Sequence, residues 1–138
     1  MGENIPADPG FAGAEVQKKG RILLVDDEEI ILQVIGELLR CMGHQVETKP
    51  GGKEALAAFL EDPFCFDLVI SDHFMPEMAG LELAGELLKR RPDTPIIILT
   101  GGDEEIESAA KAAGIRWFVR KPVSMEKLSD TVNQALTK

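Results

Sequence analysis

The sequence predicts an α/β domain in which five parallel strands form a doubly wound sheet with helices on both faces. Short apolar segments alternate along the chain with longer segments that carry apolar residues at spacings of three and four. The connections between them are short, which favours a parallel sheet whose strands are joined by crossover helices. The 138 residues, of which 44% are hydrophobic, are enough for one domain with a buried core.

The predicted strands are short segments with either continuous or alternating apolar residues. The third, "LVIS", is apolar enough to be covered on both faces, as the central strands of parallel sheets are. The second, "HQVETK", alternates apolar and polar residues with the period of a strand. The five strands are expected at residues 21–25, 44–49, 68–71, 95–100 and 115–119.

Each predicted strand is followed by a segment with helical periodicity. The first helix is expected to turn one apolar face to the core, formed by Ile30, Ile31, Val34, Ile35, Leu38, Leu39 and Met42. The next three helices are expected at residues 53–61, 81–91 and about 103–113, and Gly114 ends the last of these. The fifth helix is expected to face the core through Met125, Leu128, Val132 and Leu136.

The first twenty residues differ from the rest of the chain. "MGENIPADPGFAGAEVQKKG" contains four glycines and two prolines and shows no sustained hydrophobic period. This composition predicts a flexible leader or linker over residues 1–20, followed by a single domain over residues 21–138.

Composition excludes several other classes of protein. The net charge of −9 argues against nonspecific binding to nucleic acid. No run of about 18 apolar residues predicts a membrane span, and no signal-peptide core is present near the start. Cys41 and Cys65 have no metal-ligand partners at close spacing, so two buried free thiols in a reducing cytoplasm are expected.

Polar residues follow four of the five strands at the end where ligands bind in open α/β sheets. Asp26 and Asp27 follow the first strand, and Asp72 follows the third. Thr100 ends the fourth strand, and Lys121 comes just after the fifth. Asp72 lies eight residues before Gly80, too early to cap the helix expected from residue 81.

Three neighbouring carboxylates repel one another, so a cation is needed to compensate them. Hard oxygen ligands without histidine favour Mg²⁺, with Mn²⁺ as an alternative, and such ions often bridge to phosphate oxygens. A lysine can pair with a phosphoryl oxygen, and a hydroxyl can donate a hydrogen bond to one. The set therefore indicates phosphoryl transfer onto a carboxylate.

Four motifs in this order resemble the receiver domain of two-component response regulators. They are "LLVDDEE", "LVISDHFMPEMAG", "IIILTGG" and "FVRKP", and the resemblance covers essentially all of residues 21–138. It implies a flavodoxin-like fold with strand order 2-1-3-4-5. It also implies a regulatory phosphoacceptor domain, not an enzyme, that assists only its own phosphorylation and dephosphorylation.

The resemblance implies a role for each matched position. Asp72 would accept phosphate from a phosphohistidine, and Lys121 would pair with that phosphate. Mg²⁺ would be held by Asp26, Asp27, Asp72 and the backbone carbonyl of Phe74. The remaining implied roles are Thr100 and Phe118 as the switch hydroxyl and switch aromatic, and Pro122 as a proline joined by a cis peptide.

Several simpler interpretations compete with these roles. Asp26 or Asp27 could cap the first helix, Thr100 could be an ordinary strand residue, and Phe118 could be ordinary core. A haloacid-dehalogenase-type phosphatase would need its two acids in a DxD pattern, and a dinucleotide-binding domain would need G-x-G-x-x-G where this chain has "DDEEII". A phosphorylation-independent binding module of the same fold is the alternative function.

The resemblance also implies partners. The phosphate donor would be a histidine kinase or histidine phosphotransfer domain. An output partner or a second copy would dock on the surface of the fourth helix, fifth strand and fifth helix. No direct nucleic-acid binding and no membrane insertion are expected. The chain is expected in the cytoplasm, as a single-domain regulator or as the cytoplasmic receiver of a larger, membrane-bound hybrid kinase.

Overall fold

The computed structural model describes residues 19–137 and confirms the predicted α/β architecture. The strands are β1 (Arg21–Val25), β2 (Gln45–Lys49), β3 (Leu68–Asp72), β4 (Ile96–Thr100) and β5 (Trp117–Arg120). The helices are α1 (Glu29–Cys41), α2 (Gly52–Glu61), α3 (Gly80–Arg90), α4 (Glu104–Ala112) and α5 (Met125–Thr137). Of the predicted leader, residues 1–20, all but Lys19 and Gly20 lie outside the described residues. None of the helices between residues 19 and 137 is both long and apolar enough to cross a bilayer.

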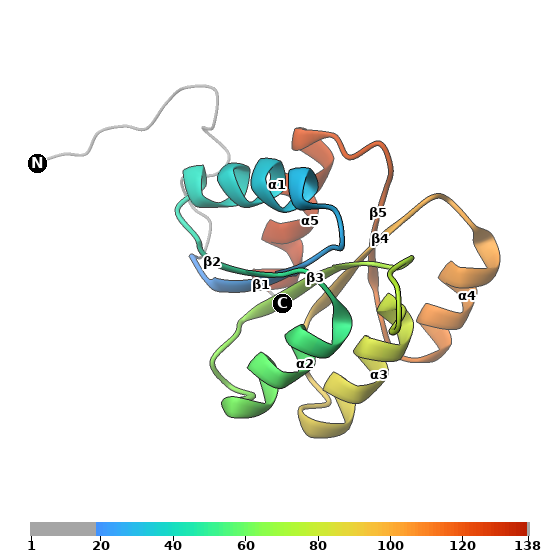
Figure 1. Cartoon of the computed structure of the whole chain (residues 1–138). Helices are drawn as coiled ribbons and strands as arrows, with labels where there is room; N and C mark the ends of the chain where they lie inside the picture. The colour runs from blue at the N-terminus through green and yellow to red at the C-terminus, as the bar shows by residue number, and fades with distance from the viewer. Residues whose placement is uncertain (1–18, 138) are drawn as a thin grey trace, which may run out of the picture.

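All four strand pairs are parallel, and the strand order is β2-β1-β3-β4-β5, which confirms the expected flavodoxin-like topology. The chain moves outward from β1 to β2 and then returns past β1 to β3. The direction of winding therefore reverses between β1 and β3 (Figure 1). In open α/β sheets this reversal opens a crevice at the carboxyl ends of the strands.

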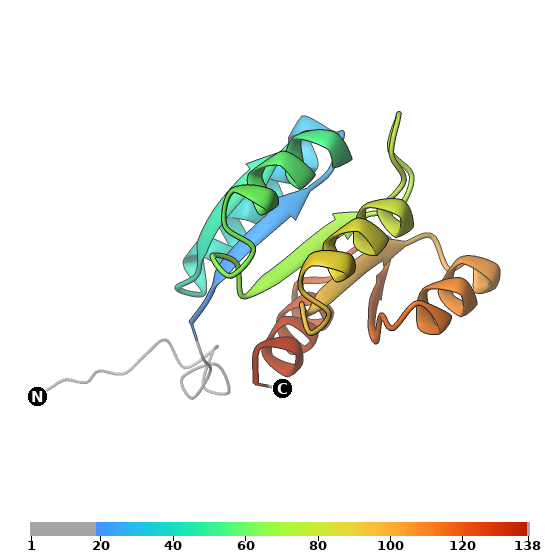
Figure 2. The ribbon, with the colours of Figure 1, turned by 90° about the horizontal axis from the view of Figure 1, so that it is seen from below.

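The sheet is covered on both faces by helices. Figure 1 shows α1 and α5 on one face and α2 and α3 on the other, and Figure 2 shows α4 at the β5 end of the sheet. Successive side chains of a strand point to opposite faces of the sheet, so alternate residues belong to two separate hydrophobic cores. Ile22 and Leu24 pack with α1 and α5, whereas Leu23 and Val25 pack with α2 and α3.

The predicted core face of α1 is partly wrong. Ile35 and Leu39 are buried against the sheet as expected, but so is Leu32, which was not among the expected core residues. Ile30 and Val34, in contrast, are 65% and 62% exposed. A helix resting on a sheet buries only one side, so residues spread over a wider arc cannot all reach the core.

Cys41 lies on the same outer side of α1 and is exposed, so the expectation that both thiols are buried is wrong. Cys65 is half-buried, and both cysteines are free thiols.

The predicted core face of α5 is wrong at its first residue. Met125 is 59% exposed, whereas Leu128, Val132 and Leu136 are buried in the core as expected.

The last strand begins later than predicted and ends at Arg120. Its expected first residue, Ile115, instead donates its backbone N–H to the carbonyl of Ala110 at 2.9 Å and closes the end of α4. The shift carries β5 to the residue directly before Lys121, at the same edge of the sheet as the end of β4.

Candidate functional site

The carboxyl edge of the sheet brings together the polar residues that follow the strands. Asp26 comes directly after β1, Asp72 is the last residue of β3 and Thr100 is the last residue of β4. Lys121 follows β5 and donates its backbone N–H to the carbonyl of Thr100 at 2.7 Å. Because every strand is parallel, these ends meet at one edge.

Three carboxylates form a cluster at this edge. Asp26, Asp27 and Asp72 each offer one oxygen, and these oxygens all lie within 4.8 Å of one another. Asp26 is fully buried, Asp72 is 5% exposed and Asp27 is exposed. The cluster lies between β1 and β3, where the winding direction of the sheet reverses.

Asp26 is not the N-cap residue of α1, and only one of its two carboxylate oxygens has a hydrogen-bond partner. Its Oδ1 accepts a hydrogen bond from the backbone N–H of Glu28 at 2.9 Å, while Glu28 itself is the N-cap residue of α1. The other oxygen, Oδ2, is buried without a hydrogen-bond partner. A buried oxygen without a partner destabilises the folded state, and coordination to a hard divalent cation would satisfy it.

Burial is the main cause of an unusual pKa at Asp26. Loss of solvent, together with the nearby charges of Asp72 and Asp27, raises the pKa of this carboxyl to about 6, against the opposing effects of the Glu28 N–H and Lys121. Lys121 thus compensates the buried negative charge of the cluster only in part, and the carboxylate oxygens fit Mg²⁺ or Mn²⁺.

Lys121 pairs directly with Asp72. Its Nζ lies 2.7 Å from Asp72 Oδ1, and the two side chains are 36% and 7% exposed. Partial burial lowers the pKa of Lys121, but the hydrogen bond and charge of Asp72, with the charge of Asp26, outweigh it and raise the pKa overall. The peptide bond between Lys121 and Pro122 is cis.

The loop after β3 is held close to the end of its own strand. Gly80 donates its backbone N–H to the carbonyl of His73 at 2.8 Å. A Cβ at Gly80 would collide with the backbone carbonyl of Asp72, so only glycine allows this approach. Phe74, on the same loop, is 66% exposed and meets the His73 ring edge-on with centroids 4.8 Å apart.

The two proposed switch residues lie near each other along β4 and β5. Thr100 is 1% exposed and lies beside Arg120 in the strand register, while Phe118 is half-buried against the core formed with α2 and α3. The Thr100 hydroxyl donates to Glu107 Oε2 at 3.0 Å and accepts the backbone N–H of Gly102 at 2.9 Å.

Sequence reasoning missed Glu107 and Arg120. The guanidinium of Arg120 donates two hydrogen bonds of 3.2 Å to the Glu107 carboxylate. In the sequence, Glu107 is one of several acids in the first turns of a helix, and Arg120 is a strand-end base. No spacing rule joins a helix to the strand after it, so the sequence carried no signal for this pair.

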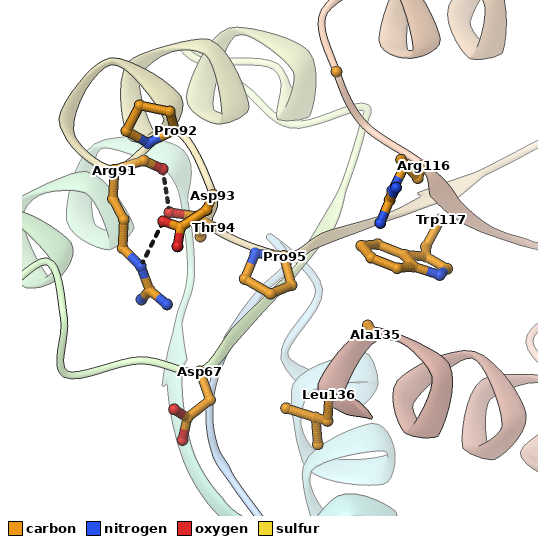
Figure 3. A pocket seen from close by; sticks show the side chains of 11 residues that line it. Asp67, Arg91, Pro92, Asp93, Thr94, Pro95, Arg116, Trp117, Ala135 and Leu136 are labelled. Carbon is orange, nitrogen blue, oxygen red and sulfur yellow. Dashed lines mark hydrogen bonds and ion pairs between the residues drawn. The ribbon is translucent and has the colours of Figure 1, made fainter. Parts of the chain in front are cut away.

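A cavity of about 550 Å³ lies at the end of the sheet opposite to the carboxylate cluster. Figure 3 shows it between Asp67, the segment before β4 and the start of β5, where Arg116 lies over the Trp117 ring at 5.0 Å. Its polar groups already have protein partners in several cases, for example Thr94 Oγ1 with the carbonyl of Arg91 at 2.6 Å and Asp67 with the backbone N–H of Arg21 at 2.8 Å. This cavity has no contact with the carboxylate cluster.

Comparison with known proteins identifies the family and the fold. The family model described as the response regulator receiver domain matches residues 22–133. The chain belongs to the response regulator receiver family. Receiver domains are the regulatory phosphoacceptor modules of two-component signalling, and the expected family and function class are confirmed.

The receiver domain resembles both curated proteins and solved structures. The transcriptional regulatory protein GlrR of Escherichia coli (strain K12) is 38% identical over 120 residues, which are 86% of this chain and 27% of GlrR. The response regulator SaeR of Staphylococcus aureus (strain USA300) is 31% identical over 118 residues, 85% of this chain and 50% of SaeR. This chain therefore spans at most half the length of these two curated relatives.

Among solved structures, a response regulator receiver domain protein from Clostridium thermocellum superposes with a TM-score of 0.81 at 36% identity, covering 85% of this chain and 94% of that one. The chemotaxis protein CheY4 of Vibrio cholerae superposes with a TM-score of 0.80 at 34% identity, covering 86% of this chain and all of CheY4. Both cover the receiver domain nearly from end to end.

Proposed function

We propose that this receiver domain accepts a phosphoryl group from a phosphohistidine onto Asp72. The observation that carries the proposal is the 2.7 Å ion pair between Lys121 and Asp72, set beside the carboxylates of Asp26 and Asp27. A carboxylate flanked by one fixed cation and by an acidic pair that can hold a divalent ion is suited to phosphoryl transfer, because the two cations would balance the negative oxygens of the transferred group.

The acidic cluster is proposed to hold Mg²⁺, with Mn²⁺ as the alternative. Asp26, Asp27, Asp72 and the backbone carbonyl of Phe74 would be its protein ligands, and the unpaired Asp26 Oδ2 supports this assignment. The bound ion would neutralise charge on the carboxylates and on the incoming phosphoryl oxygens.

The transfer step is a displacement at phosphorus. A carboxylate oxygen of Asp72 forms a bond to phosphorus while the phosphorus–nitrogen bond of the donor histidine breaks, and the imidazole leaves with that electron pair. Lys121 stays within reach of the phosphoryl oxygens, because its Nζ already contacts Asp72. The product is an acyl phosphate on Asp72.

Thr100 and Phe118 are proposed to report this product to the surface. The Thr100 hydroxyl would move to donate to a phosphoryl oxygen, and Phe118 would turn inward to fill the space it leaves, since an empty cavity is costly. The surface formed by α4, β5 and α5 would change as a result and would bind an output partner or a second copy.

An apolar groove beside the site is the proposed contact for the phosphohistidine donor. It has a volume of about 540 Å³ and lies between α1 and the segment after β5. Lys121, whose Nζ contacts Asp72, also lines this groove, so the groove lies next to the Asp72 site. Val34 and Met125, on its two walls, are 62% and 59% exposed, so a protein that binds there would bury them.

Replacing Val34 with aspartate is expected to slow transfer from a phosphorylated histidine-phosphotransfer protein by roughly tenfold or more, because a charge would be buried at the contact. Transfer from acetyl phosphate, which needs no protein contact, should not change. The matched control is Leu60→Asp on α2, where the leucine is 39% exposed and far from the groove. Equal slowing with both donors would contradict the proposed docking surface.

Labelling by a small phosphodonor tests the proposed function itself. Incubation with Mg²⁺ and acetyl phosphate is expected to add close to one phosphoryl group per chain, measured by intact-mass spectrometry, and a chelator should prevent it. Borohydride trapping followed by peptide mapping should locate the acyl phosphate at Asp72. A chain that binds its partners equally well without any labelling would instead be a phosphorylation-independent module.

A further inference from the structure

The Thr100 hydroxyl has one hydrogen, and in this structure it is already used. Glu107 Oε2 lies 3.0 Å from the hydroxyl oxygen, and the hydrogen bonds of Arg120 lower the pKa of the Glu107 carboxyl. An ionised carboxylate only accepts, so Thr100 must be the donor. The second bond of the hydroxyl is from the Gly102 N–H, which Thr100 accepts.

We infer that Glu107, held in place by Arg120, is a positioning residue that keeps the Thr100 hydroxyl away from Asp72 until phosphorylation competes for it. The inference rests on the proposed roles of Asp72 and Thr100. A single hydroxyl hydrogen cannot serve Glu107 and a phosphoryl oxygen together. The contact with Glu107 therefore stabilises the unphosphorylated arrangement and opposes the switched one.

The geometry around Glu107 makes it a firm partner for Thr100. The Glu107 side chain is 13% exposed, while Arg120 is 63% exposed and reaches it from β5 with both Nε and Nη2. Two parallel hydrogen bonds fix the plane of the carboxylate as well as its position. Its Oε2 is thereby directed at the end of β4.

The same contact ties α4 to the sheet. Ala110 is the one fully buried residue of α4, and the remainder of the helix is exposed or half-buried. Glu107 thus supplies polar links from α4 to both β4 and β5 through Thr100 and Arg120. When the Thr100 hydroxyl donates its hydrogen bond to a phosphoryl oxygen instead of Glu107, α4 loses the link to β4 and keeps the one to β5. The chemical event at Asp72 would reach α4 directly through this exchange of partners.

The experiment measures the affinity of the Mg²⁺-loaded protein for beryllofluoride, which mimics the phosphoryl group, by isothermal titration calorimetry. Glu107→Ala is expected to bind beryllofluoride roughly five- to tenfold more tightly than wild type, because the competing hydrogen bond is gone. The control is Glu105→Ala, which removes an exposed carboxylate from the same turn of α4 and should leave affinity unchanged.

A second background separates this effect from a general change in charge or stability. Thr100→Val keeps the shape of the buried side chain but removes the hydroxyl. In that background, Glu107→Ala should change beryllofluoride affinity by less than about twofold, because the two effects act through one hydrogen bond. Circular dichroism should show that each variant is folded.

The possible results separate a failure of the role inferred for Glu107 from a failure of the phosphoacceptor function proposed for Asp72. Wild type that fails to bind beryllofluoride would overturn both. Binding by wild type with no gain in Glu107→Ala would overturn the inference and leave the phosphoacceptor function standing. An equal gain with and without the Thr100 hydroxyl would also overturn it, because the effect would then be electrostatic.

Discussion

Phosphorylation by acetyl phosphate is expected to fall to background when Asp72 is replaced with asparagine. An amide is a very poor nucleophile, so the group proposed to form the bond to phosphorus is lost. Asparagine has nearly the same shape as aspartate, and its carbonyl oxygen can still accept the hydrogen bond that Lys121 now gives to Asp72 at 2.7 Å. The domain should therefore remain folded, with the same far-ultraviolet circular dichroism as wild type.

The matched control is Asp67→Asn, the same change at the opposite end of β3. Asp67 accepts the backbone N–H of Arg21 at 2.8 Å and takes no part in the acidic cluster. This variant should be labelled to the same extent as wild type, as measured by intact-mass spectrometry. Stoichiometric, hydroxylamine-sensitive labelling of Asp72→Asn would show that another residue is the acceptor.

The second large effect is expected on stability. Replacing Asp26 with asparagine should raise the free energy of unfolding of the metal-free protein by about 3 kcal/mol above pH 7. Asp26 is fully buried, and its pKa of about 6 lies well above its ordinary value of 3.8. Ionised Asp26 therefore destabilises the folded state at neutral pH, and a neutral amide at this position would remove that destabilisation.

The sign of the pH dependence follows from the direction of the shift. The folded state binds the Asp26 proton more tightly than the unfolded chain does, so protonation stabilises the fold. The advantage of Asp26→Asn should be full above about pH 7, decline as the pH falls through 6, and vanish below about pH 4. Urea denaturation at several pH values measures it, with exposed Asp93→Asn as the control.

Addition of Mg²⁺ should reverse the order of stability. At a thousandfold excess over its dissociation constant, the ion should stabilise wild type by about 4.1 kcal/mol and Asp26→Asn by much less, because a proposed ligand is missing. Asp26→Asn that is less stable than wild type in a chelator at pH 7.5 would contradict the inferred cost of the buried, ionised Asp26.

The hydrophobic pattern of the sequence was enough to predict the succession of strands and helices along the chain and the polar residues that meet at the carboxyl edge. Alternating segments with short connections allow few arrangements other than a parallel sheet, and the last residue of each parallel strand must then lie at one edge. Asp26, Asp72 and Thr100 could be assigned to that edge because each adjoins a strand that the hydrophobic pattern marks clearly.

The tertiary structure alone decided which contacts those residues make. Periodicity marks a helix and an apolar side, but the width of the strip that a sheet covers depends on how the helix rests on it. Ile30 and Val34 were therefore expected in the core from the periodicity, but both are exposed. The link from Thr100 through Glu107 to Arg120 joins three separate elements, and local sequence rules describe only neighbours within one element. Its existence depends on where α4 docks against β4 and β5, which the packing of the whole domain sets.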